Sequence, residues 1–193
     1  TSGLLFAAPF FAATVATPVW GVLGDKHGRK LMVVRASLGL ALATLLMGFA
    51  RTVPQLFVLR VAQGAVSGFI AAALALMASK APRERMGYAL GTLQTAIPTG
   101  TILGPLIGGA LADAIGYRQI FFVTAAMNLA AGIAVILLVP RDLPEPREAG
   151  FGQVFENYKT VFGTPQFRLL FFVLFGSQFA LMAIQPVMAL YVE

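Results

Sequence analysis

Several residue types that build common protein sites are missing or scarce. The 193-residue chain has no cysteine and a single histidine, His27. Without cysteine there are no disulfides, thiolate metal ligands or thiol nucleophiles, and one histidine does not make a histidine-based metal centre. The apolar stretches also lack the clustered acids that a catalytic site needs. We therefore expect no metal, no cofactor and no enzymatic activity.

Charged residues are scarce as well. They make up 11% of the chain, hydrophobic residues make up 58%, and the mean hydropathy is +0.82. A soluble domain is about 25% charged and about 45–50% apolar, and a disordered chain needs low hydrophobicity and high charge, so both classes are excluded. The net charge of +6 falls between long apolar runs. We therefore expect a lipid bilayer rather than nucleic acid as the partner.

Long apolar stretches dominate the sequence. A helix that spans a membrane needs roughly 20 mostly apolar residues, and none of the stretches alternates as a barrel strand does. The sequence therefore predicts an all-α fold, a polytopic transmembrane helical bundle. The six predicted spans are about 3–24, 31–50, 54–79, 87–111, 117–140 and 167–192.

Basic residues predict the orientation of these spans. Most of the 14 Lys and Arg residues fall in connections that would share one side of the membrane, whereas only Arg51 and Arg118 fall on the other. The basic side is predicted to be cytoplasmic, so the first span runs inward and we expect a further segment before it. The predicted cytoplasmic residues are Lys26, Arg29, Lys30, Arg35, Lys80, Arg83, Arg85, Arg141, Arg147, Lys159 and Arg168.

The connection after the first span carries the most distinctive motif, the sequence GVLGDKHGRK at 21–30. Gly21 and Gly28 permit a tight turn and a close approach of helices. Asp25 is one acid among basic residues at a helix end, so its expected partner is a basic residue or a helix N-terminus. Such a pair can break and re-form as helices move. Trp20, just before the motif, is interpreted as an anchor at the membrane interface.

A buried charge marks the third span. Arg60 lies about two turns inside it, and an Arg at a helix centre costs about 2.5–3.5 kcal/mol on insertion scales. We therefore expect it to face a cavity or a partner. Gln63 and Gly64 follow at positions that share its helix face. The alternative is that the Arg60 side chain extends outward to the interface.

Two further spans carry periodic motifs. Glycines four residues apart in the fourth span predict a close helix contact, and Pro98 permits a bend there; a glycine row also serves ordinary packing. In the last span, Phe171, Phe175 and Phe179 form a stripe at helical spacing. A stripe facing a cavity would suit flat apolar cations, whereas the alternative is a stripe that faces lipid or a neighbouring helix.

These motifs resemble those of one family. The sequence at 21–30 resembles the G-x-L-x-D-x-x-G-R-K signature of the major facilitator superfamily, and Arg60 to Gly64 resembles its helix-4 motif R-x-x-Q-G. The spacing G-x8-G-x3-G-P-x2-G-G in the fourth span is similar to the helix-5 motif of the twelve-helix drug:proton antiporters. The chain then corresponds to helices 2 to 7. The resemblance implies proton-coupled export by alternating access in a bacterial inner membrane.

The resemblance also implies roles for individual residues. Asp25, Arg29, Gly21 and Gly28 would form a conformational gate, and Arg60 would couple the proton. The antiporter motif would comprise Gly91, Gly100, Gly104, Pro105, Gly108 and Gly109. The candidate substrate-cavity residues are Gln63, Gln94, Asn128, Phe175, Gln178 and Phe179.

The same resemblance implies a division of the chain. Residues 1–140 would be an N-terminal transporter half without helix 1, 141–166 a cytoplasmic central loop with an amphipathic helix or a plain linker, and 167–193 the first helix of the second half. The implied partners are the bilayer, a small-molecule substrate, protons and the remaining helices of the transporter. Two alternatives remain: a single-solute exporter for a sugar, tetracycline or siderophore, and a non-transporting membrane sensor or accessory protein.

Overall fold

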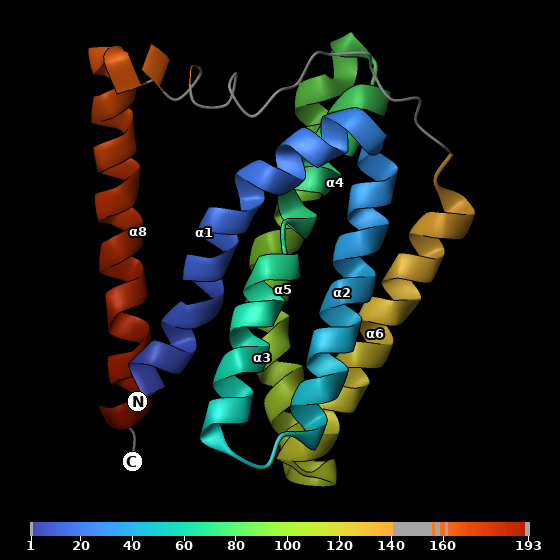
Figure 1. The fold of residues 1–193 in the computed structure, drawn as a ribbon, viewed down its shortest axis with the longest axis vertical. Helices are drawn as coiled ribbons and strands as arrows, with labels where there is room; N and C mark the ends of the chain where they lie inside the picture. The colour runs from blue at the N-terminus through green and yellow to red at the C-terminus, as the bar shows by residue number, and fades with distance from the viewer. Residues whose placement is uncertain (1, 141–155, 157–158, 161, 192–193) are drawn as a thin grey trace. The chain divides into compact units, whose positions relative to one another are not determined.

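A computed structural model describes residues 2–140, 156, 159–160 and 162–191. They fall into two units, Thr1–Ala7 with Glu148–Glu193 and Ala8–Arg147. The helices, shown in Figure 1, are α1 (Ser2–His27), α2 (Arg29–Phe49), α3 (Val53–Val66), α4 (Phe69–Lys80), the 3-10 turn η1 (Arg83–Arg85), α5 (Met86–Ile115), α6 (Tyr117–Leu138) and α8 (Pro165–Tyr191).

The predicted all-α class and the six predicted membrane spans are confirmed for the part of the chain that the structure describes. The segments long and apolar enough to cross a bilayer are Gly3–His27, Arg29–Phe49, Val53–Lys80, Arg83–Ile115, Tyr117–Leu138 and Pro165–Ala183. Helices form there because a chain in lipid must satisfy its backbone hydrogen bonds internally. The third span differs from the prediction, since it consists of α3 and α4 with a break between them.

The predicted central loop falls largely outside the described residues. The residues whose helical spacing predicts an amphipathic helix are Phe151, Val154, Phe155, Tyr158 and Phe162, and all but Phe162 lie outside the described residues, as does the predicted boundary near 141. The amphipathic helix and the three-part division therefore stay predictions. The last span does begin as a separate helix, with Pro165 at the first position of α8, where its missing N–H costs nothing.

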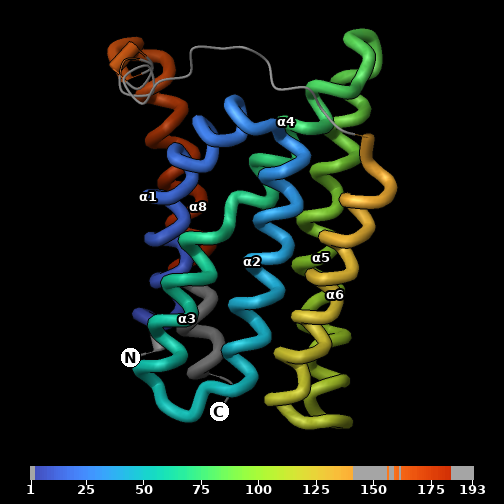
Figure 2. The backbone as a smooth tube through the Cα atoms, turned by 45° about the vertical axis from the view of Figure 1, so that its right-hand side comes forward, coloured from blue at the N-terminus to red at the C-terminus, as the bar shows by residue number. Residues whose placement is uncertain are grey.

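Helix α2 is the central element of the unit Ala8–Arg147. Half of the residues in its apolar 18-residue stretch are buried, whereas this share is 11% or less in every other span that the structure describes. It packs against α3, α4 and α6, and Figures 1 and 2 both show it alongside α6. Its buried face is rich in small residues, which let helices approach closely in a membrane. These buried residues are Met32, Val33, Val34, Ala36, Ser37, Ala41, Ala43, Thr44, Met47 and Gly48.

Glycines set the contact between α2 and α6. A Cβ on Gly48 would lie 2.8 Å from the ring of Phe122, and a Cβ on Gly132 would lie 3.2 Å from the Cβ of Ser37. The Phe122 ring also packs edge-on against Phe49, with 5.1 Å between ring centroids. The two helices therefore approach closely at Gly48 and at Gly132, where an added side chain would force a neighbouring side chain to shift.

The basic residues gather as the sequence predicts within this unit. Figure 1 shows the α1–α2 turn and the α4–α5 connection at one end, and the α2–α3 and α5–α6 turns at the other. The first end therefore carries the Lys26–Lys30 cluster and the Lys80–Arg85 segment, and the second carries Arg51 and Arg118. This asymmetry supports the predicted orientation, with the α1–α2 turn on the cytoplasmic side.

Helix α3 approaches α1 more closely than a side chain would allow. Gly64 is buried, and a Cβ built on it would collide with the backbone carbonyl of Pro9. By contrast, a Cβ on Gly87, in the first turn of α5, meets nothing within 4 Å.

Replacing Gly64 with alanine should therefore destabilise the protein. Backbone atoms cannot move aside as a flexible side chain does, and overpacking costs about 1–3 kcal/mol. The matched control Gly87→Ala should hold or raise the stability, because alanine favours a helix over glycine by up to about 1 kcal/mol. The apparent Tm of the complete protein in detergent measures both. Equal Tm values for the two variants would contradict the close α1–α3 contact.

Candidate functional site

The turn between α1 and α2 consists of one residue. α1 ends at His27 and α2 begins at Arg29, and the intervening Gly28 has φ of 97°. That conformation suits glycine because it has no Cβ. The turn brings Asp25 of α1 close to Arg29 of α2, with 3.9 Å between Oδ1 and Nη2. The structure thus gives Asp25 a basic partner, as predicted, while its role as a gate stays a prediction.

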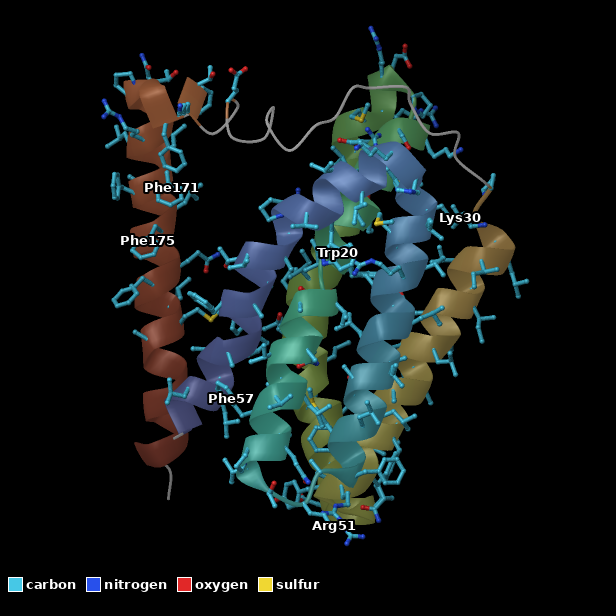
Figure 3. The ribbon with its side chains drawn as sticks, viewed as in Figure 1. Trp20, Lys30, Arg51, Phe57, Phe171 and Phe175 are labelled. Carbon is cyan, nitrogen blue, oxygen red and sulfur yellow. The ribbon has the colours of Figure 1, made fainter. Side chains whose placement is uncertain are left out.

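The basic residues of this turn also bind neighbouring helices through backbone carbonyls. Arg29 Nη1 donates to the carbonyl of Ala75 in α4 at 3.2 Å. Lys30 Nζ donates to the carbonyls of Ile136 and Val139, at 2.8 and 2.5 Å, where α6 ends. Figure 3 shows Lys30 beside that end. A cation is stabilised at a helix C-terminus by the orphan carbonyls and the helix dipole.

A small cavity lies between α1, α2 and α4. Its volume is about 150 Å³, and its wall includes the predicted gate residues Gly21, Asp25 and Arg29. Arg35 and Gly68 line it as well. Three of the four predicted gate residues therefore meet at one cavity, and the fourth, Gly28, forms the turn between α1 and α2.

Arg60 has a partner on its own helix. Its Nη1 donates to Oε1 of Gln63 at 3.4 Å, and both side chains are partly buried. The predicted shared face of Arg60, Gln63 and Gly64 is therefore confirmed. No acidic side chain within the described ranges forms an ion pair with Arg60. Its role in proton coupling stays a prediction.

The break between α3 and α4 is a feature that sequence reasoning missed. α3 ends at Val66, and Gly68 adopts the left-handed conformation with φ of 100°. The Ser67 N–H turns back to the carbonyl of Gly64 at 3.1 Å. A break inside a membrane span leaves backbone carbonyls without helical partners. The cluster of Gly64, Ser67 and Gly68 in the middle of an apolar stretch was the available signal.

Two side chains from other helices bind the carbonyls at this break. Trp20 Nε1 donates to the carbonyl of Ala65 at 2.7 Å, and Arg35 Nη2 donates to the carbonyl of Ser67 at 3.0 Å. The guanidinium carbon of Arg35 lies 3.4 Å from the centroid of the Trp20 ring, so the two groups stack. We call Trp20 and Arg35 the clasp.

The clasp corrects two interpretations from the sequence. Trp20 was expected at the membrane interface, yet Figure 3 shows it between the helices, and its indole N–H donates to the carbonyl of Ala65 in α3. Arg35 was grouped with the cytoplasmic loop charges, yet it lies inside α2, where α2 faces the break. Both errors have one cause: the sequence shows a polar residue but not the carbonyl that it binds.

The glycine row of α5 has no packing partner among the described residues. A Cβ added at Gly91, Gly100, Gly104, Gly108 or Gly109 meets nothing within 4 Å. The predicted close helix contact is therefore not formed by the part of the chain that the structure describes. The backbone does remain helical through Pro98 and Pro105. The antiporter role of Pro105 and these glycines stays a prediction.

The polar cavity candidates of the unit Ala8–Arg147 do not form one group. Gln63 binds Arg60, and Gln94 is exposed on α5. Asn128 Nδ2 donates to the carbonyl of Thr124 on its own helix at 2.9 Å. No hydrogen bond within the described ranges links Gln63, Gln94 and Asn128, so their place in a substrate cavity stays a prediction.

The phenylalanine stripe is confirmed on α8. The rings of Phe171 and Phe175 stack with centroids 6.3 Å apart and planes 13° apart, and those of Phe175 and Phe179 stack at 6.0 Å and 23°. Gln178 lies beside this ladder of rings, and all four side chains are exposed. Their contact with a substrate stays a prediction.

The described residues contain no group of three metal-ligating side chains of the His, Cys, Asp and Glu types. Six apolar spans and a basic turn that ties α2 to its neighbours define a polytopic α-helical membrane protein. Residues 1–193 match the family model of the Major Facilitator Superfamily. The chain belongs to this family of transporters.

Similar proteins support the same placement. The chain is 40% identical over 196 residues to a protein of Serratia proteamaculans named Multidrug resistance protein MdtG, covering 100% of this chain and 47% of that protein. Proteins of the same name from Proteus mirabilis and Rahnella sp. are each 38% identical, over 198 and 196 residues, and the match covers all of this chain and 48% and 47% of them. The chain thus spans about half the length of these relatives.

Proposed function

We propose that the complete protein is a proton-coupled exporter of drugs or other small amphipathic molecules in a bacterial inner membrane. One observation carries this proposal: the whole chain is similar to proteins named for multidrug resistance, at up to 40% identity. The spacing of the α5 glycines, which resembles an antiporter motif, favours export. A proton that crosses 100 mV supplies about 2.3 kcal/mol, enough for about a fiftyfold gradient of a neutral solute.

The geometry of the α1–α2 turn suits a gate in alternating access. The ion pair of Asp25 and Arg29 is long at 3.9 Å, and the side chains remain 38% and 23% exposed. Such a pair contributes only about 0–1 kcal/mol, so it can break and re-form during a cycle. Because Arg29 also binds the Ala75 carbonyl, a change at the pair is transmitted to α4.

The ladder of rings on α8 suits an apolar, flat substrate. Phe171, Phe175 and Phe179 offer stacked aromatic faces along one side of the helix. Aromatic faces attract cations that have lost part of their hydration. We therefore infer that lipophilic cations are among the substrates.

Cells that lack their own pumps provide the first test. Expression of the complete protein should lower the accumulation of a fluorescent lipophilic cation, and a protonophore should restore it, because the proton gradient drives export. Dye fluorescence over time, with and without the protonophore, measures both effects. Accumulation equal to that of vector controls, with the protein present in the membrane, would contradict multidrug export and favour the single-solute or sensor alternatives.

The gate predicts that Asp25→Asn abolishes export while the protein is still inserted. Asparagine keeps the shape of the side chain but removes the charge that pairs with Arg29, and the exposed pair adds little stability. The matched control is Glu84→Gln, which removes an exposed acid from the 3-10 turn at the same end. Efflux rates normalised to membrane expression measure the difference. Wild-type export by Asp25→Asn would remove Asp25 from the gate.

A further inference from the structure

The break between α3 and α4 divides a membrane span into two half-helices. A backbone carbonyl without a partner is costly in lipid, so a break persists only where other groups supply hydrogen bonds. Here the donors come from two different helices, Trp20 of α1 and Arg35 of α2. The break is therefore a junction of α1, α2, α3 and α4 rather than a local defect.

The chemistry of Arg35 fits this junction closely. Its guanidinium carbon lies over the Trp20 ring at 3.4 Å, and its Nη2 donates to the carbonyl of Ser67 at 3.0 Å. It also lies where α3 ends, and the C-terminal end of a helix dipole favours a cation. Gly68 is required for its φ of 100° rather than for space, since a Cβ there would make only ordinary contacts with Arg35 and Trp20.

Two arginines of α2 hold the half-helix α4. Arg35 binds the Ser67 carbonyl just before α4 begins, and Arg29 binds the Ala75 carbonyl about two turns later. Arg29 is also the partner of Asp25. Arg29, Arg35 and Asp25 line the same cavity of about 150 Å³. The position of α4 therefore depends on the clasp at one end and on the Asp25–Arg29 pair at the other.

We propose that Arg35 is a positioning residue of the transport cycle, which by stacking on Trp20 and binding Ser67 holds the α3–α4 break bent and fixes α4 against the Asp25–Arg29 cavity. The effect on transport rests on the proposed function. The effect on the position of α4 does not, because it is measured without substrate. Arg35 does not contact the substrate in this proposal; it acts through α4.

The kinetic test uses the complete transporter and the variants Arg35→Gln and Arg35→Lys. Removal of the clasp should lower the maximal rate of dye efflux about tenfold and leave KM within about twofold, because transport slows while substrate contacts are unchanged. Arg35→Lys keeps a cation and a donor but loses the planar stacking surface, so its rate should lie between those of Arg35→Gln and the wild type. Arg51→Gln removes an exposed cation at the opposite end and should leave the rate unchanged.

The structural test follows a single cysteine at the cavity wall. Ala72→Cys is suitable because Ala72 lines the cavity and these 193 residues hold no natural cysteine. Any cysteine elsewhere in the complete protein is replaced by serine. In substrate-free membranes, Arg35→Gln should raise the rate at which a water-soluble maleimide labels this cysteine by about fivefold. Arg51→Gln should leave the labelling rate unchanged.

A second pair of variants decides the matter if Arg35→Gln is not inserted. Trp20→Phe loses the hydrogen bond to Ala65 but keeps an aromatic face for Arg35, whereas Trp20→Leu loses both, so labelling should be faster and efflux slower in the leucine variant than in the phenylalanine variant. Labelling at the wild-type rate in Arg35→Gln, or in Trp20→Leu if the former is absent from the membrane, would overturn the proposal. The proposal would also be overturned if Arg35→Gln kept the wild-type maximal efflux rate, or if its loss of activity appeared only as a higher KM. If the wild type exports no dye, the labelling rates alone decide.

Discussion

Every backbone carbonyl within the membrane needs a hydrogen-bond donor, and the structure depends on how this requirement is met. Unbroken helices meet it within themselves. The span Val53–Lys80 does not, because it breaks at Ser67 and Gly68. The indole of Trp20 and the guanidinium of Arg35 supply the hydrogen-bond donors that the broken helix lacks. A single local interruption therefore fixes the contacts of α1, α2, α3 and α4 at once.

The same chemistry recurs at three other contacts in which a basic side chain joins two helices. Arg29 binds the carbonyl of Ala75, Lys30 binds the end of α6, and Arg118 Nη2 binds the carbonyl of Ala50 at 3.2 Å. In these three contacts the acceptor is a backbone carbonyl, whereas the ion pair of Asp25 and Arg29 joins α1 to α2 through a carboxylate. The carbonyls bound by Lys30 and Arg118 lie at helix ends, where the helix dipole also favours a cation. A chain with a charge of +6 thereby uses its cations to connect helices as well as to set orientation.

Much of the fold could be predicted from the sequence. The six spans follow from the length of the apolar stretches, and the one-residue turn at Gly28 follows from the glycines of the motif. The basic partner of Asp25 follows from its place among basic residues at a helix end, and the shared face of Arg60 and Gln63 follows from helical spacing. These features depend on residues close together in the chain, which is why local pattern alone predicts them.

The remaining features depend on contacts between distant segments. The break at Gly68 is stabilised by Trp20 and Arg35, which lie 48 and 33 positions earlier in the sequence. No periodicity reveals that an indole from α1 and a guanidinium from α2 meet at one turn of α3. The sequence equally cannot show that α5 presents its glycines to open space in this part of the chain. The role of those glycines in export and the role of the α8 phenylalanines in substrate binding therefore remain proposals.

The indole proton of Trp20 tests the central claim most directly, because it reports on the broken helix without reference to transport. Nitrogen-15 labelling of tryptophan in the complete protein, with the Trp20 signal assigned through its loss in Trp20→Phe, gives one resonance to follow. The clasp predicts an indole N–H that is hydrogen-bonded and exchanges slowly with deuterated water. An indole N–H that exchanges as fast as that of an interfacial tryptophan would show that Trp20 does not bind the Ala65 carbonyl, and the account of the break would be wrong.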